Sequence, residues 1–193
     1  MTFISDLLGL LAFRAQALRS LAERGTFAWG VLLFSVGFLA YALVRNSVYA
    51  DLPELLGRRS GLVGSFWDLN FIQAVLFLLL IYIPTVIVLS NALAGYGFGF
   101  SVSRKEYREH SSALLTLWGL LYIITAPMQW LVPHFFIIGM LEISFGMLVR
   151  LILVLAYTLW AIKQLNYLSL VQAFGVFVLS WFTLALYYFF ISS

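Results

Sequence analysis

The chain has 193 residues, of which 63% are hydrophobic and only 10% are charged, whereas soluble proteins average about 25% charged residues. This composition excludes a soluble globular fold and predicts an integral membrane protein, with a single domain because about five spans of ~20 residues use up the length. The net charge of +3 fits an excess of Lys and Arg on the cytoplasmic side, so no nucleic-acid partner is expected. The absence of cysteine excludes disulfides and thiolate metal sites.

Residues 1–26 have the spacing of an amphipathic helix. Apolar residues recur at three- and four-residue steps from Phe3 to Ala22, with polar residues mostly between them. Arg14, Arg19 and Arg24 follow the apolar stretch, which is opposite to the order in a secretory signal. We expect this helix to lie on the membrane surface; the alternative is a helix packed against the protein's own bundle.

Five apolar stretches follow, and each is long enough to cross ~30 Å of hydrocarbon as a helix. They cover about residues 27–44, 71–90, 113–132, 143–162 and 169–191. The predicted fold class is therefore all-α: residues 27–193 form a polytopic membrane bundle of five transmembrane helices, preceded by the N-terminal amphipathic helix. Segment 133–140 is compatible with a short interfacial or re-entrant piece.

The distribution of Lys and Arg orients the chain, because cytoplasmic segments carry the excess of these residues. With the N-terminus inside, seven lie on inner segments and three on outer ones. This predicts a cytoplasmic N-terminus and an outer C-terminus. The inner set is Arg14, Arg19, Arg24, Arg104, Lys105, Arg108 and Lys163; the outer set is Arg45, Arg58 and Arg59.

Proline and glycine mark breaks and close contacts within the spans. Pro84 and Pro127 each lack a backbone donor and are expected to bend the second and third spans. Gly30 with Gly37, and the pair at positions 139 and 146, are seven residues apart and are candidates for close helix contacts.

Two motifs suggest chemistry only weakly. The alternating glycines of AGYGFG at 94–99 fit neither phosphate-loop spacing, so a flexible turn is the better interpretation. Glu106 and His110 share a helix face and could begin a metal site, but such a site needs a second cluster that the sequence lacks. A charge-paired helix near the lipid headgroups is the better interpretation. We predict no enzyme activity, no cofactor and no metal.

Arg150 is the charge that topology does not explain. It precedes Lys163 by thirteen positions, about 20 Å along a helix, which places its backbone ~10 Å inside the outer boundary. An ionised group at that depth costs a few kcal/mol unless it is paired or wetted. We predict an intramembrane polar site of Arg150, Glu142, Asp68 and Gln129, with Asp68 as the preferred partner. The alternatives are a snorkelling side chain or structural ion pair, and a polar cavity or partner-subunit contact.

Motifs between residues 75 and 190 carry a family resemblance. Stretch 89–127 contains a small-residue and glycine turn, the basic segment SRKEY at 103–107, and a span with Pro127. WAIKQLNYLSLVQA at 160–173 joins a Trp-bearing span to the last span through a short polar turn. Together these motifs resemble the middle and the last connection of the Yip1 domain.

The resemblance implies a five-span bundle with a cytoplasmic N-terminus. Eukaryotic members of the family act in vesicle trafficking and associate with Rab-type small GTPases and with one another. This chain departs from them, because the segment before its first span is short and lacks a DLYGP-like motif. That departure puts small-GTPase binding in doubt, and the short form looks more bacterial, which predicts the bacterial inner (plasma) membrane.

Two classes of function remain open. The favoured one is a non-enzymatic scaffold or accessory subunit of a membrane protein complex, in contact with membrane lipids and with other integral membrane proteins or itself. The missing catalytic constellations favour it. The alternative is a small transporter or lipid-handling protein with a polar path near Arg150. That path would use Gln73, Thr125, Gln129, Glu142 and Arg150.

Overall fold

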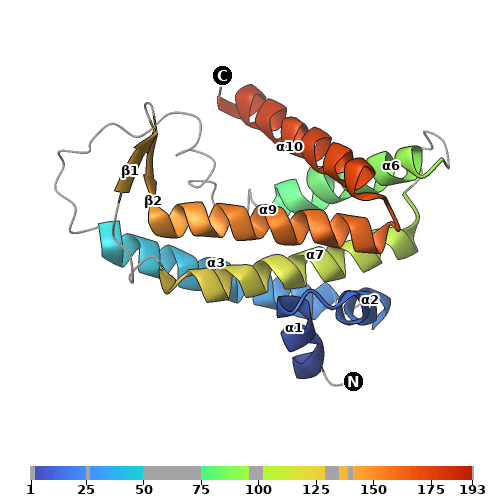
Figure 1. Cartoon of the computed structure of the whole chain (residues 1–193), viewed down its shortest axis with the longest axis horizontal. Helices are drawn as coiled ribbons and strands as arrows, with labels where there is room; N and C mark the ends of the chain where they lie inside the picture. The colour runs from blue at the N-terminus through green and yellow to red at the C-terminus, as the bar shows by residue number, and fades with distance from the viewer. Residues whose placement is uncertain are drawn as a thin grey trace.

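In the computed structural model of the chain, the described residues form helices and one two-stranded hairpin (Figure 1). The structure describes residues 3–24, 27–49, 75–95, 102–128, 135–138 and 141–192. Its elements are α1 (Phe3–Leu11), α2 (Ala15–Arg24), α3 (Phe27–Tyr49), the π-helical turn η2 (Leu78–Tyr82), α6 (Ile83–Leu93), α7 (Arg104–Thr125), β1 (Phe135–Ile138), β2 (Leu141–Ser144), α9 (Phe145–Leu165) and α10 (Leu170–Ser192).

The N-terminal segment forms two helices rather than one continuous helix. The chain turns at Phe13, whose φ is 52°, and the Arg14 N–H donates to the Gly9 carbonyl at 2.9 Å. Gly9 permits the close approach of α1 and α2, because a Cβ there would lie 2.6 Å from the Ala17 Cβ. Leu18 is fully buried against the bundle. The alternative of packing against the protein's own bundle therefore describes α2, while α1 leaves Ile4 and Leu8 on the surface.

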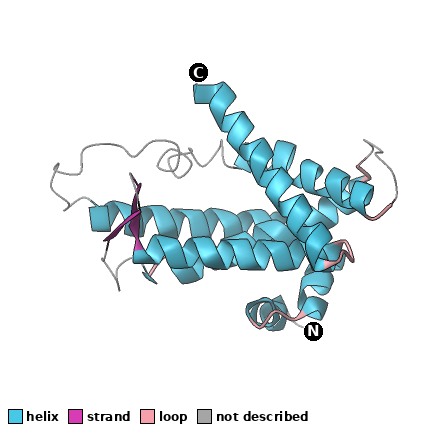
Figure 2. Ribbon diagram, turned by 45° about the horizontal axis from the view of Figure 1, so that its top comes forward, coloured by secondary structure: helices cyan, strands magenta, loops and turns pink. Residues whose placement is uncertain are grey.

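Helices α3 and α7 lie side by side. They run in the same direction, because Gly30 lies against Ser112 and Gly37 against Gly119. Figure 2 shows the long helices packed side by side, with the two strands at one end of them. A Cβ on Gly30 would meet the Ser112 carbonyl oxygen at 3.1 Å, and a Cβ on Gly37 would overlap the Gly119 carbonyl. The close contact predicted at Gly30 and Gly37 is confirmed, with Gly119 as its partner on α7. Position 139 of the second predicted glycine pair lies outside the described residues.

Helix α9 runs antiparallel to α7. The Trp118 indole N–H donates to Thr158 Oγ1 at 2.8 Å near the middle of both helices. Farther along α7, Tyr122 meets Arg150, which is earlier on α9. Helix α10 packs on α6, where the Gln172 amide donates to the Leu93 carbonyl at 2.9 Å and caps the end of that helix.

Pro84 and Pro127 were expected to bend the helices that contain them, but each lies at the end of a helix. Pro84 lies in the first turn of α6, directly after η2. In this π-helical turn the Ile83 N–H bonds to the Leu78 carbonyl, five residues earlier instead of four. This wider turn accommodates Pro84, which has no N–H of its own to donate. Pro127 does not lie inside a helix, because α7 ends at Thr125. Ala126, the residue before it, still has helical φ and ψ angles of −56° and −51°, and its N–H bonds to the Tyr122 carbonyl. Because Pro127 has no N–H to donate, the hydrogen-bond series of the helix stops after Ala126.

The helix ends differ from the predicted span ends. The third span is predicted at 113–132, whereas α7 begins at Arg104, where Ser103 caps it, and ends at Thr125; residues 129–132 lie outside the described residues. The fourth span is predicted at 143–162, and α9 covers Phe145–Leu165. Segment 133–140 includes β1, which pairs antiparallel with β2 and places Phe135 opposite Ser144. Backbone pairing in the hairpin satisfies groups that an irregular loop would leave open.

Two helices among the described residues are long and apolar enough to cross a membrane, Val75–Leu93 and Leu148–Leu165. A third span results if the bent pair of α2 and Phe27–Tyr41, which meet at 115°, is taken as one. Leu170–Thr183 is an apolar helix of shorter described length. The described residues therefore carry two or three candidate spans rather than the five expected.

Candidate functional site

Arg150 lies inside the bundle, held between two tyrosine rings. It extends from α9 into the space between α3 and α7 and is 2% exposed. Its guanidinium carbon is 3.9 Å from the centroid of the Tyr41 ring and 4.4 Å from that of Tyr122. The two rings meet edge to face, with their centroids 5.5 Å apart at 70°. The cation therefore faces two π systems contributed by two different helices.

This arrangement stabilises a charge without bulk water. The face of an aromatic ring carries partial negative charge, and a desolvated cation–π contact contributes about 2 kcal/mol or more. Further aromatic rings back the pair: the Phe34 ring meets Tyr122 edge to face at 5.7 Å, and the Phe38 ring lies 5.9 Å from it. The site therefore ties α3, α7 and α9 together, because one cation on α9 contacts a ring from each of the other two helices.

The described residues do not include the side chains of the other residues predicted for this site. Asp68 and Gln129 lie outside the described residues, and for Glu142 only the backbone, in β2, is described. The predicted grouping of these three with Arg150 therefore stays a prediction. The ring contacts with Tyr41 and Tyr122 were missed by sequence reasoning. Arginine is known to pack on aromatic faces, and this is the only signal that the sequence offers for such a contact. It does not identify the ring, because the sequence does not show which helices lie beside α9.

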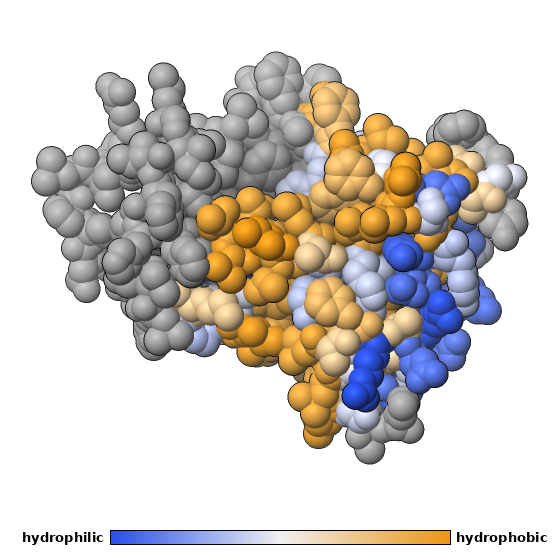
Figure 3. Space-filling view, in the orientation of Figure 1, coloured by the Kyte–Doolittle hydropathy of each residue, from blue (hydrophilic) through white to orange (hydrophobic). Residues whose placement is uncertain are grey.

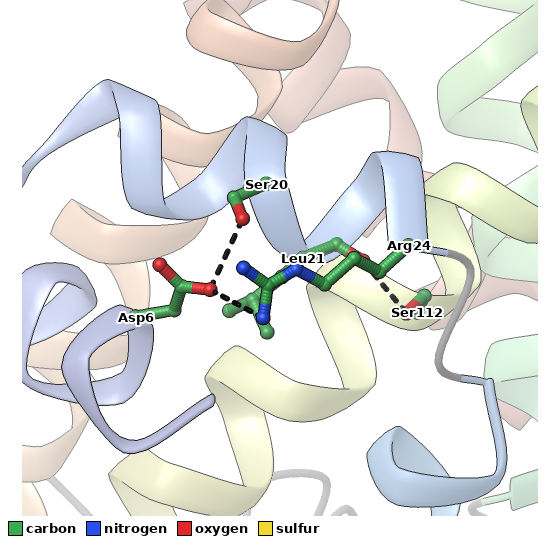
Figure 4. Close-up of polar contacts among 5 residues, drawn as sticks. All are labelled: Asp6, Ser20, Leu21, Arg24 and Ser112. Carbon is green, nitrogen blue, oxygen red and sulfur yellow. Dashed lines mark hydrogen bonds and ion pairs between the residues drawn. The ribbon is translucent and has the colours of Figure 1, made fainter. Parts of the chain in front are cut away.

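A second polar cluster joins the N-terminal helices to each other and to α7 (Figure 4). The Asp6 side chain of α1 is fully buried and accepts a hydrogen bond from Ser20 Oγ at 3.0 Å. Its Oδ2 atom also lies 3.2 Å from Arg24 Nη1 at the end of α2. Ser112 Oγ of α7 donates to the Leu21 carbonyl at 3.2 Å. A buried carboxylate is stable only with such partners, so this cluster fixes where α2 ends.

Aromatic contacts dock the turn between α1 and α2 on α9. The Phe13 ring stacks on Tyr157 with centroids 4.0 Å apart and meets Trp160 edge to face at 5.4 Å. The Tyr157 hydroxyl donates to the Leu11 carbonyl at 2.7 Å. The left-handed backbone at Phe13 places its ring in this contact, which offsets the cost of that conformation.

Glu106 and His110 serve the ends of helices. Glu106 and Ser103 form a reciprocal capping box, with both hydrogen bonds at 3.1 Å. Hydrogen bonding to Ser103 lowers the pKa of the Glu106 carboxyl below its usual value. His110 Nδ1 contacts the Glu106 carbonyl at 2.9 Å and Nε2 contacts Asn166 Oδ1 at 3.0 Å. The Nδ1 contact thus lies within α7, and the Nε2 contact joins α7 to the turn before α10.

Within the described part of the chain, no group of three or more His, Cys, Asp and Glu side chains is arranged to hold a metal ion. Comparison with protein-family models, with curated proteins and with solved structures finds no match to this chain. The protein is therefore a helical, strongly apolar chain whose described residues include two or three candidate membrane spans. The resemblance to the Yip1 domain stays a prediction that rests on the motifs at 89–127 and 160–173.

Proposed function

We propose that the chain is a non-enzymatic, Yip1-like integral membrane protein that acts as a scaffold or accessory subunit of a membrane protein complex. In this proposal it crosses the bacterial inner membrane five times, with a cytoplasmic N-terminus and an outer C-terminus. Its surface contacts lipid and other integral membrane proteins or further copies of itself. Small-GTPase binding is not included, because the chain lacks the eukaryotic N-terminal motif.

The observation that carries this proposal is the enclosure of Arg150. A transport path needs an intramembrane charge that faces a wetted cavity, where it can meet a substrate. Arg150 is instead 2% exposed and covered by the rings of Tyr41 and Tyr122. A cation used in this way holds three helices in register, which favours a structural role over the alternative of a transporter.

The directions of the helices support the five-span topology. Span one and span three of an alternating bundle run the same way, and span four runs the opposite way. Helices α3 and α7 are parallel, as the contacts of Gly30 and Gly37 show, and α9 is antiparallel to α7. These three helices contain the first, third and fourth expected spans.

The clustering of polar groups supports one common inner side. The Arg19 guanidinium lies 4.6 Å from the ring centroid of Tyr167, and His110 contacts Asn166. Segments expected on the cytoplasmic side thus meet at one end of the bundle. Figure 3 shows hydrophilic residues gathered at this end and an apolar band beside it. Helices α3 and α10 also expose apolar residues typical of a lipid-facing surface: Leu32, Val36, Leu39, Leu170, Val171, Phe174, Val178 and Phe182.

Cysteine labelling tests the topology without background, because the chain contains no cysteine. Single variants Thr2→Cys and Ser193→Cys, expressed in intact cells, are treated with a membrane-impermeant maleimide. We expect labelling of Ser193→Cys only, and labelling of both after the membrane is opened. Labelling of Thr2→Cys in intact cells, or protection of Ser193→Cys, contradicts the proposed orientation.

Purification of the full chain in mild detergent tests the function. A scaffold is expected to co-purify with a defined membrane protein or as a defined homo-oligomer. Arg150→Lys is the informative variant, because it keeps the charge while losing the planar guanidinium that stacks on two rings. We expect complex formation to fall in step with the thermal stability of this variant. A solitary wild-type particle, or a stable Arg150→Lys chain that has lost only a solute flux in liposomes, supports the transporter instead.

A further inference from the structure

The candidate span Val75–Leu93 changes its hydrogen-bond register just before Pro84. In the π-helical turn η2, the Ile83 N–H bonds to the Leu78 carbonyl. In this register, the next bond along the chain would join the N–H of residue 84 to the Leu79 carbonyl. Proline has no N–H, so the backbone of residue 84 cannot supply that bond, and the Leu79 carbonyl needs another donor.

A tyrosine from another helix supplies this donor. The Tyr107 hydroxyl, near the start of α7, donates to the Leu79 carbonyl at 2.9 Å across a separation of 28 residues in sequence. The capping box of Ser103 and Glu106 fixes the helix start directly before Tyr107, and the Tyr107 N–H bonds to the Ser103 carbonyl at 3.0 Å. The hydroxyl is thus held by α7 at the point where Pro84 leaves a hydrogen bond unmade.

The register of η2 decides which face of residues 75–82 is buried. After the turn, the buried residues follow helical spacing: Ile83, Val86, Ile87 and Ser90. Steps of three and four residues back from Ile83 along a regular α-helix would add Leu80 and Leu76 to that buried face. Leu80 is instead 67% exposed and Leu76 is 48% exposed. The buried residues before the turn include Phe77 and Leu78. The extra residue in η2 has therefore rotated this part of the span by about 100°, which is the angle of one residue in a helix.

The rotated segment ends at a contact in the centre of the bundle. Tyr82, the last residue of η2, is 1% exposed, and its ring centroid lies 5.3 Å from that of Trp118 on α7. The Trp118 indole in turn bonds to Thr158 of α9. The register of the span thus affects packing against two other helices.

We propose that the Tyr107 hydroxyl sets the register of the second span by replacing the hydrogen bond that Pro84 removes. Two features then hold residues 75–82 in the rotated position. The proline disfavours the regular register, because its ring meets the carbonyl four residues earlier, and the tyrosine satisfies the Leu79 carbonyl. When both are removed, this part of the span turns back, and Leu76 and Leu80 become buried. The inference does not rest on the scaffold role proposed above.

A double-mutant cycle tests whether Tyr107 acts for the missing proline donor. Tyr107→Phe removes only the hydroxyl and is expected to lower the folding equilibrium constant about tenfold, measured by SDS unfolding of the full chain in mild detergent. Pro84→Ala returns an N–H to the backbone, so the loss from Tyr107→Phe in this background is expected to be less than about threefold. Tyr157→Phe is the matched control, because the Tyr157 hydroxyl donates to the Leu11 carbonyl at 2.7 Å. Its loss is expected to be equal in both backgrounds.

A spin label reports the register itself. Because the chain has no cysteine, a nitroxide can be attached to Leu80→Cys alone, and its collisions with oxygen measured in detergent. The label is expected to be accessible in the otherwise wild-type chain and with Tyr107→Phe or Pro84→Ala alone. When both substitutions are present, its accessibility is expected to fall severalfold. A label at Leu39→Cys, a position on α3 that is 60% exposed, is the control and should not change.

Four results overturn the proposal. A Tyr107→Phe chain as stable as the wild type shows that the hydroxyl holds nothing, whatever the other variants do. Equal losses from Tyr107→Phe with and without Pro84 show that the hydroxyl does not replace the proline donor. A label at position 80 that moves as far with Pro84→Ala alone as with both substitutions shows that the proline alone sets the register. An unchanged label in the doubly substituted chain, with circular dichroism verifying that it is folded, shows that neither residue does.

Discussion

Substitution of Gly119 by alanine tests the close contact between α3 and α7. A Cβ at this position would lie 2.5 Å from the Phe34 nitrogen and 2.6 Å from the Leu33 carbonyl oxygen. These are backbone atoms of a neighbouring helix, so no side-chain rotation relieves the overlap and the two helices must separate. Overpacking costs about 1–3 kcal/mol, and a rigid backbone favours about 3. Alanine returns about 1 kcal/mol through helix propensity, which leaves a net loss of about 2 kcal/mol.

Gly175 of α10 provides the matched control for this substitution. A Cβ there meets only the Leu93 Cδ1 at 3.8 Å, an ordinary contact. Gly175→Ala is therefore expected to be neutral or to stabilise the fold by up to about 1 kcal/mol. The two alanine variants should differ by about 3 kcal/mol, which is on the order of a hundredfold in the unfolding equilibrium.

The assay is equilibrium unfolding of the purified chain in mild detergent as the fraction of SDS rises, followed by circular dichroism and tryptophan fluorescence. Gly119→Ala should unfold at a clearly lower SDS fraction than the wild type, and Gly175→Ala at the same fraction or a higher one. If the two variants unfold together, the α3–α7 contact is not as close as described, and the argument for parallel packing of these helices fails.

Three further predictions follow from single contacts. A double-mutant cycle of Arg150→Met and Tyr122→Leu should give a coupling energy of about 2 kcal/mol by the same unfolding assay, and additive effects would show that the ring does not hold the cation. Asp6→Asn should loosen the N-terminal helices by about 1–3 kcal/mol, seen as faster hydrogen exchange in α1. The exposed Glu23→Gln should leave this exchange unchanged, and equal exchange in both variants would contradict a role for the buried pair. Because the folded-state pKa of Glu106 is lowered, its contribution to stability is complete at neutral pH and is lost as the pH falls through that folded pKa. The stability difference between wild type and Glu106→Gln should shrink on acidification, and a constant difference would refute the capping role.

Some helix ends can be predicted from residues close to them in the sequence, and others cannot. Ser103 caps the start of α7, and Pro127, which has no N–H to donate, follows its end, so these two local signals explain why α7 covers 104–125. A hydropathy window instead centres on the apolar part and places the span at 113–132. The turn at Phe13 has no such local signal, because the rings of Tyr157 and Trp160 that stabilise it come from another helix.

Composition and local pattern by themselves determined the approximate apolar helices, including those long enough to cross a membrane, and the close contact at Gly30 and Gly37. These properties depend on residue type and on spacing along one helix, which the chain carries locally. Only the tertiary structure decided that Gly119 is their partner, that α3 and α7 run in parallel, and that Tyr41 and Tyr122 cover Arg150. The physical reason is that a buried charge is stabilised by whichever groups meet it in space. Those groups come from helices that are far apart in the sequence, and the rotation and packing of the helices decide which of them meet the charge.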